Sequence, residues 1–77
     1  MPTEPIPNDV KLLRFLADEM TQAELGRRVG LTRQTIAAIE QGGYSPSLDA
    51  AFRIADVFGK RVDEIFHWRG KDREGNG

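Results

Sequence analysis

Two short helical segments joined by a glycine-centred turn constrain the fold of this chain more than any other feature. The first segment begins at Thr21, where Glu24 three residues later predicts a capping box. It ends just before Gly30, which supplies a left-handed stop, and Thr32 then caps a second segment that runs to Gln41. Because the connection is so short, the two helices must cross at a large angle, which is typical of a helix-turn-helix.

Signals of the same kind predict three further helices. Caps and apolar spacing place them at about 9–18 after Asn8, at 48–58 after Ser47, and at 62–66. No stretch alternates with a period of two over a useful length, although His67–Trp68 is compatible with the end of a short strand. The predicted class is therefore all-α, with about five short helices.

By composition, the 77 residues form one domain with two irregular ends. Residues 1–7 hold three prolines and are expected to form an extended arm. Residues 69–77 are charged and glycine-rich, which predicts a flexible tail. The domain is then residues 8–68, and a core this small is often supported by a partner chain.

Several classes of protein find no support in the composition. The chain has no cysteine and one histidine, His67, so it offers no disulfide and no metal-ligand spacing. No nucleophile has a base nearby in sequence, and Gly42-Gly43 is explained better as a helix stop than as a phosphate loop. We expect no enzyme activity, no metal and no cofactor.

The sequence also lacks the signals of a membrane or secreted protein. No apolar run approaches the ~18 residues of a membrane span. The first residues have neither the basic nor the apolar region of a secretory signal. We therefore expect a cytoplasmic protein with no membrane contact.

The second segment of the helix-turn-helix has an unusual outward face. On a helical wheel, Ile36 and Ile39 point toward the core. The opposite face is small and amide-bearing, with a cation at its flank, and consists of Gln34, Ala37, Ala38, Gln41 and Arg33. Glutamine pairs with adenine and arginine with guanine, and alanine permits close approach to a DNA groove. The alternative is a solvated surface of good helix formers.

Net charge gives only a weak argument about nucleic acid. The whole chain carries −1, whereas DNA binding needs local positive charge. Residues 1–20 hold two basic and four acidic side chains, a net charge of −2. Residues 22–40 hold three arginines and two glutamates, a net charge of +1. The positive excess is modest, but it coincides with the helix-turn-helix.

Glu40 lies where a helix disfavours negative charge, near the C-terminus of the second segment. It is also close to Ile36 on the wheel, at the margin of the core, so its carboxylate needs a cationic partner. Arg14 on the first predicted helix is the best candidate. The alternative is that both are solvated surface charges.

Residues 21–42, TQAELGRRVGLTRQTIAAIEQG, resemble the helix-turn-helix of Cro and the lambdoid repressors, also called the xenobiotic-response-element family. The resemblance continues through YSPSL at 44–48, IADVFG at 54–59 and DEIF at 63–66, and covers residues 8–68. Apolar, glycine and capping positions all fall in register, which makes the resemblance specific.

Two positions depart from the family pattern. Gly26 stands where alanine is usual, which keeps the close helix packing but loosens the helix. Asp18-Glu19 stands where a glycine is common. This departure affects where the first helix ends, but it does not affect the helix-turn-helix motif.

The resemblance implies a compact five-helix, lambda-repressor-like domain that binds double-stranded DNA. The residues implied to face base edges are Thr32, Arg33, Gln34, Ala37 and Ala38. Those implied to meet phosphates are Gln22, Thr35, Gln41 and the backbone near Gly42 and Gly43. An arginine of the first helix paired with a glutamate ending the recognition helix recurs in the family, which supports the structural pair Arg14–Glu40.

The fourth predicted helix is apolar on more than one side, which is typical of a central helix or of one that contacts a partner. Helix-turn-helix proteins usually bind two half-sites about 34 Å apart as two-fold dimers. We therefore predict a homodimer whose interface includes Ile54, Val57, Phe66 and Trp68. The alternative is that Phe66 and Trp68 only cover the core of a monomer.

Three functional hypotheses follow. The first is a sequence-specific transcriptional regulator, a repressor that binds an inverted repeat as a homodimer through the major groove. The second is the antitoxin half of a toxin–antitoxin pair, which binds DNA and a protein partner. The third is a protein-binding adaptor that keeps the fold without DNA binding, and the modest local charge leaves room for it.

Overall fold

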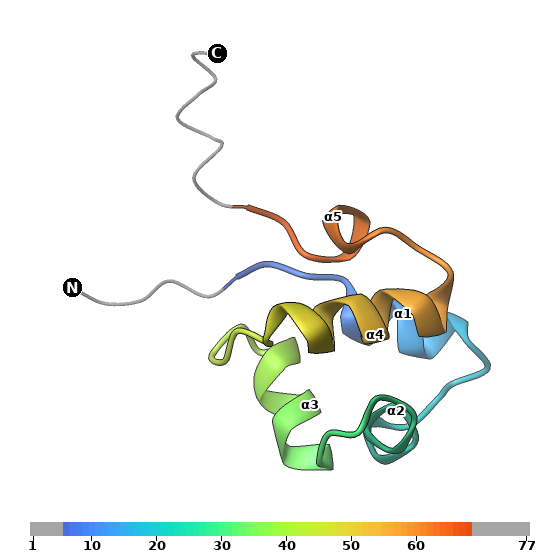
Figure 1. Ribbon diagram of the computed structural model, residues 1–77. Helices are drawn as coiled ribbons and strands as arrows, with labels where there is room; N and C mark the ends of the chain where they lie inside the picture. Colours follow the sequence, from blue (N-terminus) through green and yellow to red (C-terminus); the bar gives the residue numbers. More distant parts are fainter. Residues whose placement is uncertain (1–5, 69–77) are drawn as a thin grey trace, which may run out of the picture.

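Five α-helices follow one another along residues 6–68, the part of the chain that this computed structural model describes (Figure 1). They are α1 (Val10–Leu16), α2 (Gln22–Val29), α3 (Arg33–Glu40), α4 (Leu48–Phe58) and α5 (Val62–Ile65). Within these residues there is no strand, only an isolated bridge between Asn8 and Phe66. The His67 N–H also donates to the Pro7 carbonyl at 2.8 Å, so the predicted strand is reduced to one short backbone contact. The predicted tail lies outside the described residues, as does most of the predicted arm.

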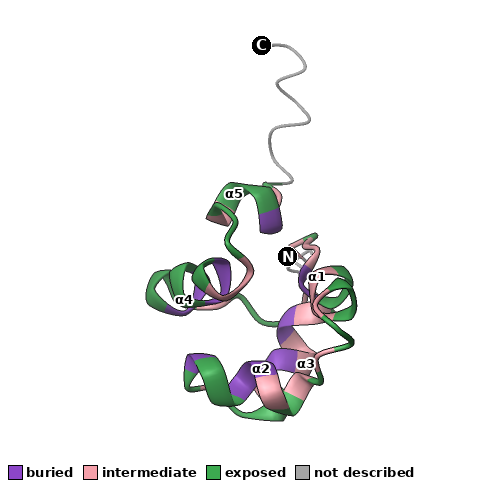
Figure 2. Cartoon of the chain, turned by 90° about the vertical axis from the view of Figure 1, so that its right-hand side faces the viewer, coloured by how far each residue is buried: buried purple, intermediate pink, exposed green. Residues whose placement is uncertain are grey.

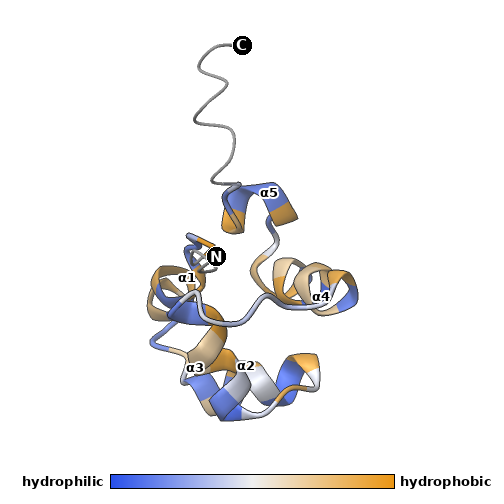
Figure 3. Ribbon diagram, turned by 90° about the vertical axis from the view of Figure 1, so that its left-hand side faces the viewer, coloured by the Kyte–Doolittle hydropathy of each residue, from blue (hydrophilic) through white to orange (hydrophobic). Residues whose placement is uncertain are grey.

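The helices surround one apolar core. α1 and α4 lie on opposite sides of the molecule, with α2 and α3 at one end and α5 at the other (Figures 2 and 3). Every helix contributes at least one side chain that is fully buried, and these include Val10, Leu25, Ile36, Ile39, Ile54 and Ile65. Burying such a side chain stabilises the fold by about 1.5–3 kcal/mol. The core therefore holds all five helices together.

Predicted caps are present at three helix starts. The hydroxyls of Thr21, Thr32 and Ser47 accept the N–H three residues on, at 3.0, 3.0 and 3.1 Å. The reciprocal half of the capping box predicted at Thr21 is wrong, because the Glu24 carboxylate pairs instead with the two arginines that follow it on α2. Each cap satisfies a backbone donor that the helix itself leaves free.

The turn between α2 and α3 depends on two glycines. Gly30 adopts φ +77°, a left-handed conformation that disfavours other residues. A Cβ at Gly26 would lie 2.4 Å from the Leu31 carbonyl oxygen, far inside contact distance. The chain leaving α2 therefore passes directly over Gly26, and the usual alanine would not fit this backbone without a shift.

The first helix is shorter than predicted. It ends at Leu16 rather than near Asp18, and Asp18 and Glu19 adopt φ of 61° and 56°. These left-handed residues turn the chain back so that the Met20 N–H donates to the Arg14 carbonyl at 2.9 Å. Without the family's glycine, each such residue costs roughly 1–2 kcal/mol. Arg14 holds this turn in place, because its guanidinium also donates to the Met20 carbonyl at 2.7 Å.

Candidate nucleic-acid interface

α3 presents one side to the core and the other to solvent. Ile36 and Ile39 are buried as predicted. The side chains predicted to face base edges lie away from the core, where Thr32, Arg33 and Gln34 are exposed and Ala37 and Ala38 are half-buried. The exposed residues lie at the N-terminal end of α3, where the first backbone N–H groups have no intrahelical partner. This end can therefore donate to an anion or to base edges.

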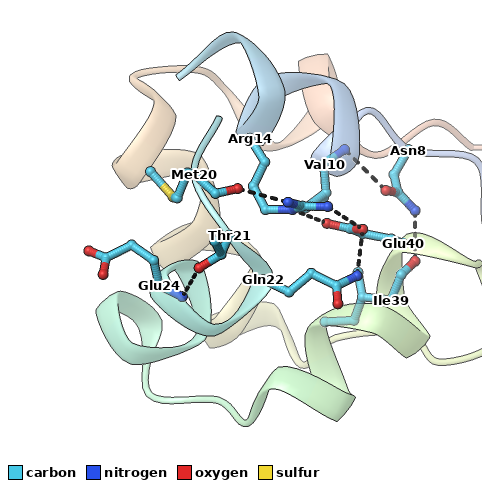
Figure 4. Close-up of polar contacts among 9 residues, drawn as sticks. All are labelled: Asn8, Val10, Arg14, Met20, Thr21, Gln22, Glu24, Ile39 and Glu40. Carbon is cyan, nitrogen blue, oxygen red and sulfur yellow. Dashed lines mark hydrogen bonds and ion pairs between the residues drawn. The ribbon is translucent and has the colours of Figure 1, made fainter. Parts of the chain in front are cut away.

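An ion pair fixes the other end of α3 to the first helix (Figure 4). The Arg14 guanidinium donates to the Glu40 carboxylate from Nε at 2.6 Å and from Nη2 at 3.0 Å. The two side chains are only 14% and 5% exposed. The hydrogen bonds to Glu40 and its negative charge raise the pKa of Arg14, outweighing the desolvation that would lower it. The pair is thus a mostly buried, bidentate contact, the strongest geometry for these groups.

Two more contacts extend this pair into a network. Arg14 Nη1 donates to the Met20 carbonyl at 2.7 Å, just before α2, and Gln22 Nε2 donates to Glu40 Oε1 at 3.0 Å. On the other side, Asn8 Nδ2 donates to the Ile39 carbonyl at 2.9 Å. The end of α3 is therefore tied to three segments of the chain, which pre-organises the helix-turn-helix before any ligand binds.

Sequence reasoning missed two of these contacts. Gln22 was assigned to phosphate, and its contact with Glu40 joins residues 18 positions apart. Asn8 was predicted to cap α1, but the cap residue is Asp9, whose side chain makes no capping bond. Asn8 lies one position earlier, where its Oδ1 accepts the Val10 N–H at 3.2 Å. Nothing in the local sequence indicated that its amide would also reach Ile39, 31 positions away.

Several of the groups expected to donate to phosphates already donate within the chain. Gln22 has one amide hydrogen engaged by Glu40, which leaves its second hydrogen and its backbone N–H at the first turn of α2. The Gly42 and Gly43 amides donate to the Ile39 and Ala38 carbonyls at 2.9 and 3.0 Å, closing α3. Because both N–H groups already donate within the chain, they are not free to donate to a DNA phosphate as the resemblance implied.

Two side chains predicted to meet phosphates remain at the edges of α3. The Gln41 side chain is exposed just after the helix. The Thr35 hydroxyl lies 2.9 Å from the Thr32 hydroxyl, so the two side chains form one polar pair at the start of α3.

Arg33 differs from the other arginines in its pairing. Within residues 6–68, every arginine except Arg33 has a carboxylate partner, the paired residues being Arg14, Arg27, Arg28, Arg53 and Arg61. Arg33 is exposed and lines an open hollow with Gln22 and Ala23 at the start of α2, and the acidic Glu19 lines the same hollow without an ion pair to Arg33. An external anion or an acceptor on a base edge would therefore not compete with an internal partner.

The predicted dimer surface is partly wrong. Ile54 is 0% exposed and belongs to the core, so it cannot contact a partner. Val57 and Phe66 are half-buried against the core, whereas Trp68 is 70% exposed. The alternative, that both side chains cover the core of a monomer, therefore holds for Phe66 and is wrong for Trp68. Contact of either residue with a partner chain stays a prediction.

Apolar side chains of α4 are exposed near Phe66. Leu48 and Phe52, one turn apart on α4, are 70% and 59% exposed. Leu48 lines a hollow with Phe66, and Phe52 lines another with Val62. We call Leu48, Phe52, Val62 and Phe66 the C-terminal apolar surface. The fourth helix was predicted to be apolar on more than one side, but the sequence did not show which of its side chains remain uncovered.

Two observations bear on other kinds of function. Among residues 6–68, no three His, Asp or Glu side chains are grouped so that they would hold a metal ion. None of the helices in that range has the length and apolar character needed to cross a membrane. The hollows named above are open surface depressions rather than enclosed cavities.

Comparison with known proteins agrees with this architecture. A family model described as helix-turn-helix matches residues 11–65. An uncharacterized HTH-type transcriptional regulator of Methanocaldococcus jannaschii is 48% identical over 59 residues, covering 77% of this chain and 88% of that protein. One of Bacillus subtilis, described in the same words, has the same identity and coverage.

A solved structure shares the fold. The crystal structure of a Bacteroides fragilis protein, provisionally described as DNA-binding, superposes with a TM-score of 0.68. It covers 80% of this chain and 98% of its own, at 19% sequence identity. At that identity the likeness supports the five-helix fold alone.

Proposed function

The chain belongs to the helix-turn-helix family, and from that membership we propose that it is a sequence-specific, DNA-binding transcriptional regulator that acts as a repressor. α3 is the helix proposed to enter the major groove. Its exposed N-terminal residues and its two alanines form the reading face. Binding there would exclude other proteins from the same stretch of duplex.

We assign separate roles to the side chains of this face. Arg33 donates to guanine and Gln34 to adenine, while Ala37 and Ala38 allow the helix axis to approach the bases. Thr32 and Thr35, with the free N–H groups at the start of α3, meet a phosphate or a base edge. Gln22 and Gln41 hold the backbone on either side, which fixes the register of α3 in the groove.

The observation that carries this proposal is the contrast between the two ends of α3. One end is fixed by the Arg14–Glu40 pair and by Gln22. The other end presents Arg33, which has no carboxylate partner among residues 6–68. A helix held rigidly, with a free cation and amides at its exposed end, suits direct readout of bases.

We further propose that the protein binds an inverted repeat as a homodimer through the C-terminal apolar surface, with Trp68 at its edge. This assignment replaces buried Ile54 and half-buried Val57 by Val62 and by Leu48 and Phe52, of which the last two are exposed. Such side chains on one side of a domain are the usual mark of an interaction site. A two-fold axis on this side would leave α3 of each protomer free to enter one half-site.

Binding to DNA is tested by titrating a labelled random-sequence duplex at several salt concentrations, with fluorescence anisotropy as the readout. We expect the logarithm of the affinity to fall linearly with the logarithm of the salt concentration, because phosphate contacts release counterions. Absence of binding at low salt, or an affinity that does not depend on salt, would contradict the proposal and favour the adaptor hypothesis.

A further inference from the structure

The outward side of α1 is apolar although nothing in the described chain covers it. Leu12, Phe15 and Leu16 are 53%, 61% and 68% exposed. They occupy positions i, i+3 and i+4 and form one face of the helix, opposite the side that carries buried Val10 and half-buried Leu13. We call these three residues the α1 outer face. Clustered exposed apolar residues on a small domain mark an interaction site more often than scattered ones.

The proposed DNA contacts and homodimer do not account for this face. α1 lies on the opposite side of the molecule from α4, which carries much of the C-terminal apolar surface (Figures 2 and 3). A dimer formed through α4 and α5 would therefore leave the α1 outer face uncovered. None of its three residues is assigned a DNA contact, although Phe15 borders the hollow that Arg33 and Gln22 also line.

Charges flank the α1 outer face in a self-complementary way. Lys11 precedes Phe15 by four residues and Glu19 follows it by four, and both are exposed. Phe15 also separates two surface hollows, one lined by Lys11 and Leu12 and the other by Glu19. Rotation by 180° about an axis near Phe15 would bring Lys11 of each molecule toward Glu19 of the other.

We propose that the α1 outer face is a second self-association surface, on which α1 of another copy of this chain packs antiparallel. Each Phe15 would lie against the other molecule's hollow beside Leu12, and two Lys11–Glu19 pairs would flank the contact. An isologous contact requires a surface complementary to itself, and this arrangement of charges provides it. Association through α1 is a property of the protein alone and does not require DNA.

The size of the α1 outer face sets the expected strength of the contact. Three side chains bury far less than the roughly 800 Å² per partner of a standard stable interface. The contact should therefore be weak and concentration-dependent in solution. Between molecules that already sit side by side on one duplex, the raised effective concentration would make it matter.

The test is sedimentation velocity of the whole chain without DNA, over micromolar to millimolar concentrations. Phe52→Glu serves as the background, because it is intended to remove the proposed dimer of the C-terminal apolar surface. We expect this variant to remain in a monomer–dimer equilibrium. Adding Phe15→Glu should lower its association constant by about tenfold or more. Thermal unfolding by circular dichroism confirms that each variant folds.

A charge exchange makes the test specific for a second copy. Lys11→Glu alone and Glu19→Lys alone should each weaken association in the Phe52→Glu background, because each places like charges together. The double variant should restore it, since the pairs re-form with opposite polarity. A structural effect on α1 alone would not show this rescue.

Three results would overturn the proposal. They are a Phe52→Glu protein that stays monomeric at all concentrations, an association constant unaffected by Phe15→Glu, and a double charge variant as weak as the single ones. The first would leave the α1 outer face to a partner of different sequence. If Phe52→Glu associates as strongly as the wild type, the proposed dimer of the C-terminal apolar surface is contradicted. The effect of Phe15→Glu on association still tests the α1 outer face.

Discussion

Arg14 and Glu40 join the first helix to the last turn of α3 through two hydrogen bonds, of 2.6 and 3.0 Å, between residues 26 positions apart. The same carboxylate accepts a third hydrogen bond from Gln22 at the start of α2. One side chain thus sets the relative positions of three helices. The orientation of the proposed reading face depends on a contact made at the opposite end of the helix.

Glu40→Gln should destabilise the fold strongly. It keeps the shape of the side chain but leaves the mostly buried Arg14 guanidinium without a counter-charge, which costs about 3 kcal/mol. The free energy of unfolding from urea titrations measures this loss. Glu24→Gln is the matched control, because its arginine partners are 72% and 51% exposed. That change should cost under about 1 kcal/mol. Equal losses in the two variants would show that the Arg14–Glu40 pair is not a structural contact.

Ser47→Ala should cost about 1 kcal/mol of stability, because the Ser47 hydroxyl caps α4. Ser45→Ala, two residues earlier, removes the same hydroxyl from an exposed side chain that makes no hydrogen bond among residues 6–68. Its midpoint of chemical denaturation should match that of the wild type. If the two variants lose the same free energy of unfolding, the hydrogen bond from the Ser47 hydroxyl does not stabilise α4.

Phe52→Glu should abolish the proposed dimer of the C-terminal apolar surface. A charge in the centre of an apolar contact would be buried without a partner, which is strongly unfavourable. Size-exclusion chromatography with light scattering at micromolar concentration reports the mass directly. Phe15→Glu, an equally exposed phenylalanine on the other side of the molecule, is the control and should leave the mass unchanged at that concentration. A wild-type protein that is already monomeric would contradict the prediction.

Arg33→Ala should weaken binding to a preferred duplex by about 1–3 kcal/mol and relax the preference at one base pair. The reason is the loss of a charge-assisted contact to a base edge. Arg61→Ala removes an arginine that is paired with Asp63 near α5, far along the chain from α3. Its affinity should stay within about twofold of the wild type. Unchanged binding of Arg33→Ala on every sequence tested would mean that α3 is not the reading helix.

Local sequence signals predicted much of the fold because the interactions behind them are local. Thr32 caps the helix that follows it, and Gly30 adopts the left-handed turn that its lack of a side chain allows. These contacts join residues three or four positions apart. A reader of the sequence can therefore recognise them without knowing the tertiary structure.

The sequence was less informative where distant residues decide the outcome. Asn8 looks like a simple helix cap, and only the folded chain brings its amide to Ile39. The departure at Asp18-Glu19 left the end of α1 open, and the hydrogen bonds that join Met20 to Arg14 become visible only in the folded chain. These effects arise from packing between segments rather than from propensity.

Helical wheels could not separate core from interface where a helix is apolar on several sides. Ile54 was assigned to a partner and is buried in the monomer, while Phe52, on the same helix, was not assigned to the interface and is exposed. On α1, no sequence pattern indicated that Phe15 is exposed. Which apolar face is covered depends on where the other helices lie, and the sequence does not state that.

The most direct test of the proposed function is selection of binding sites from a random duplex library at near-physiological salt. The proposal predicts an enriched inverted repeat with half-site centres about 34 Å apart, one helical turn of DNA. The same selection with Arg33→Ala should lose the preference at one position of each half-site. Recovery of no preferred sequence, together with weak binding that disappears as salt is raised, would contradict the claim that α3 reads DNA.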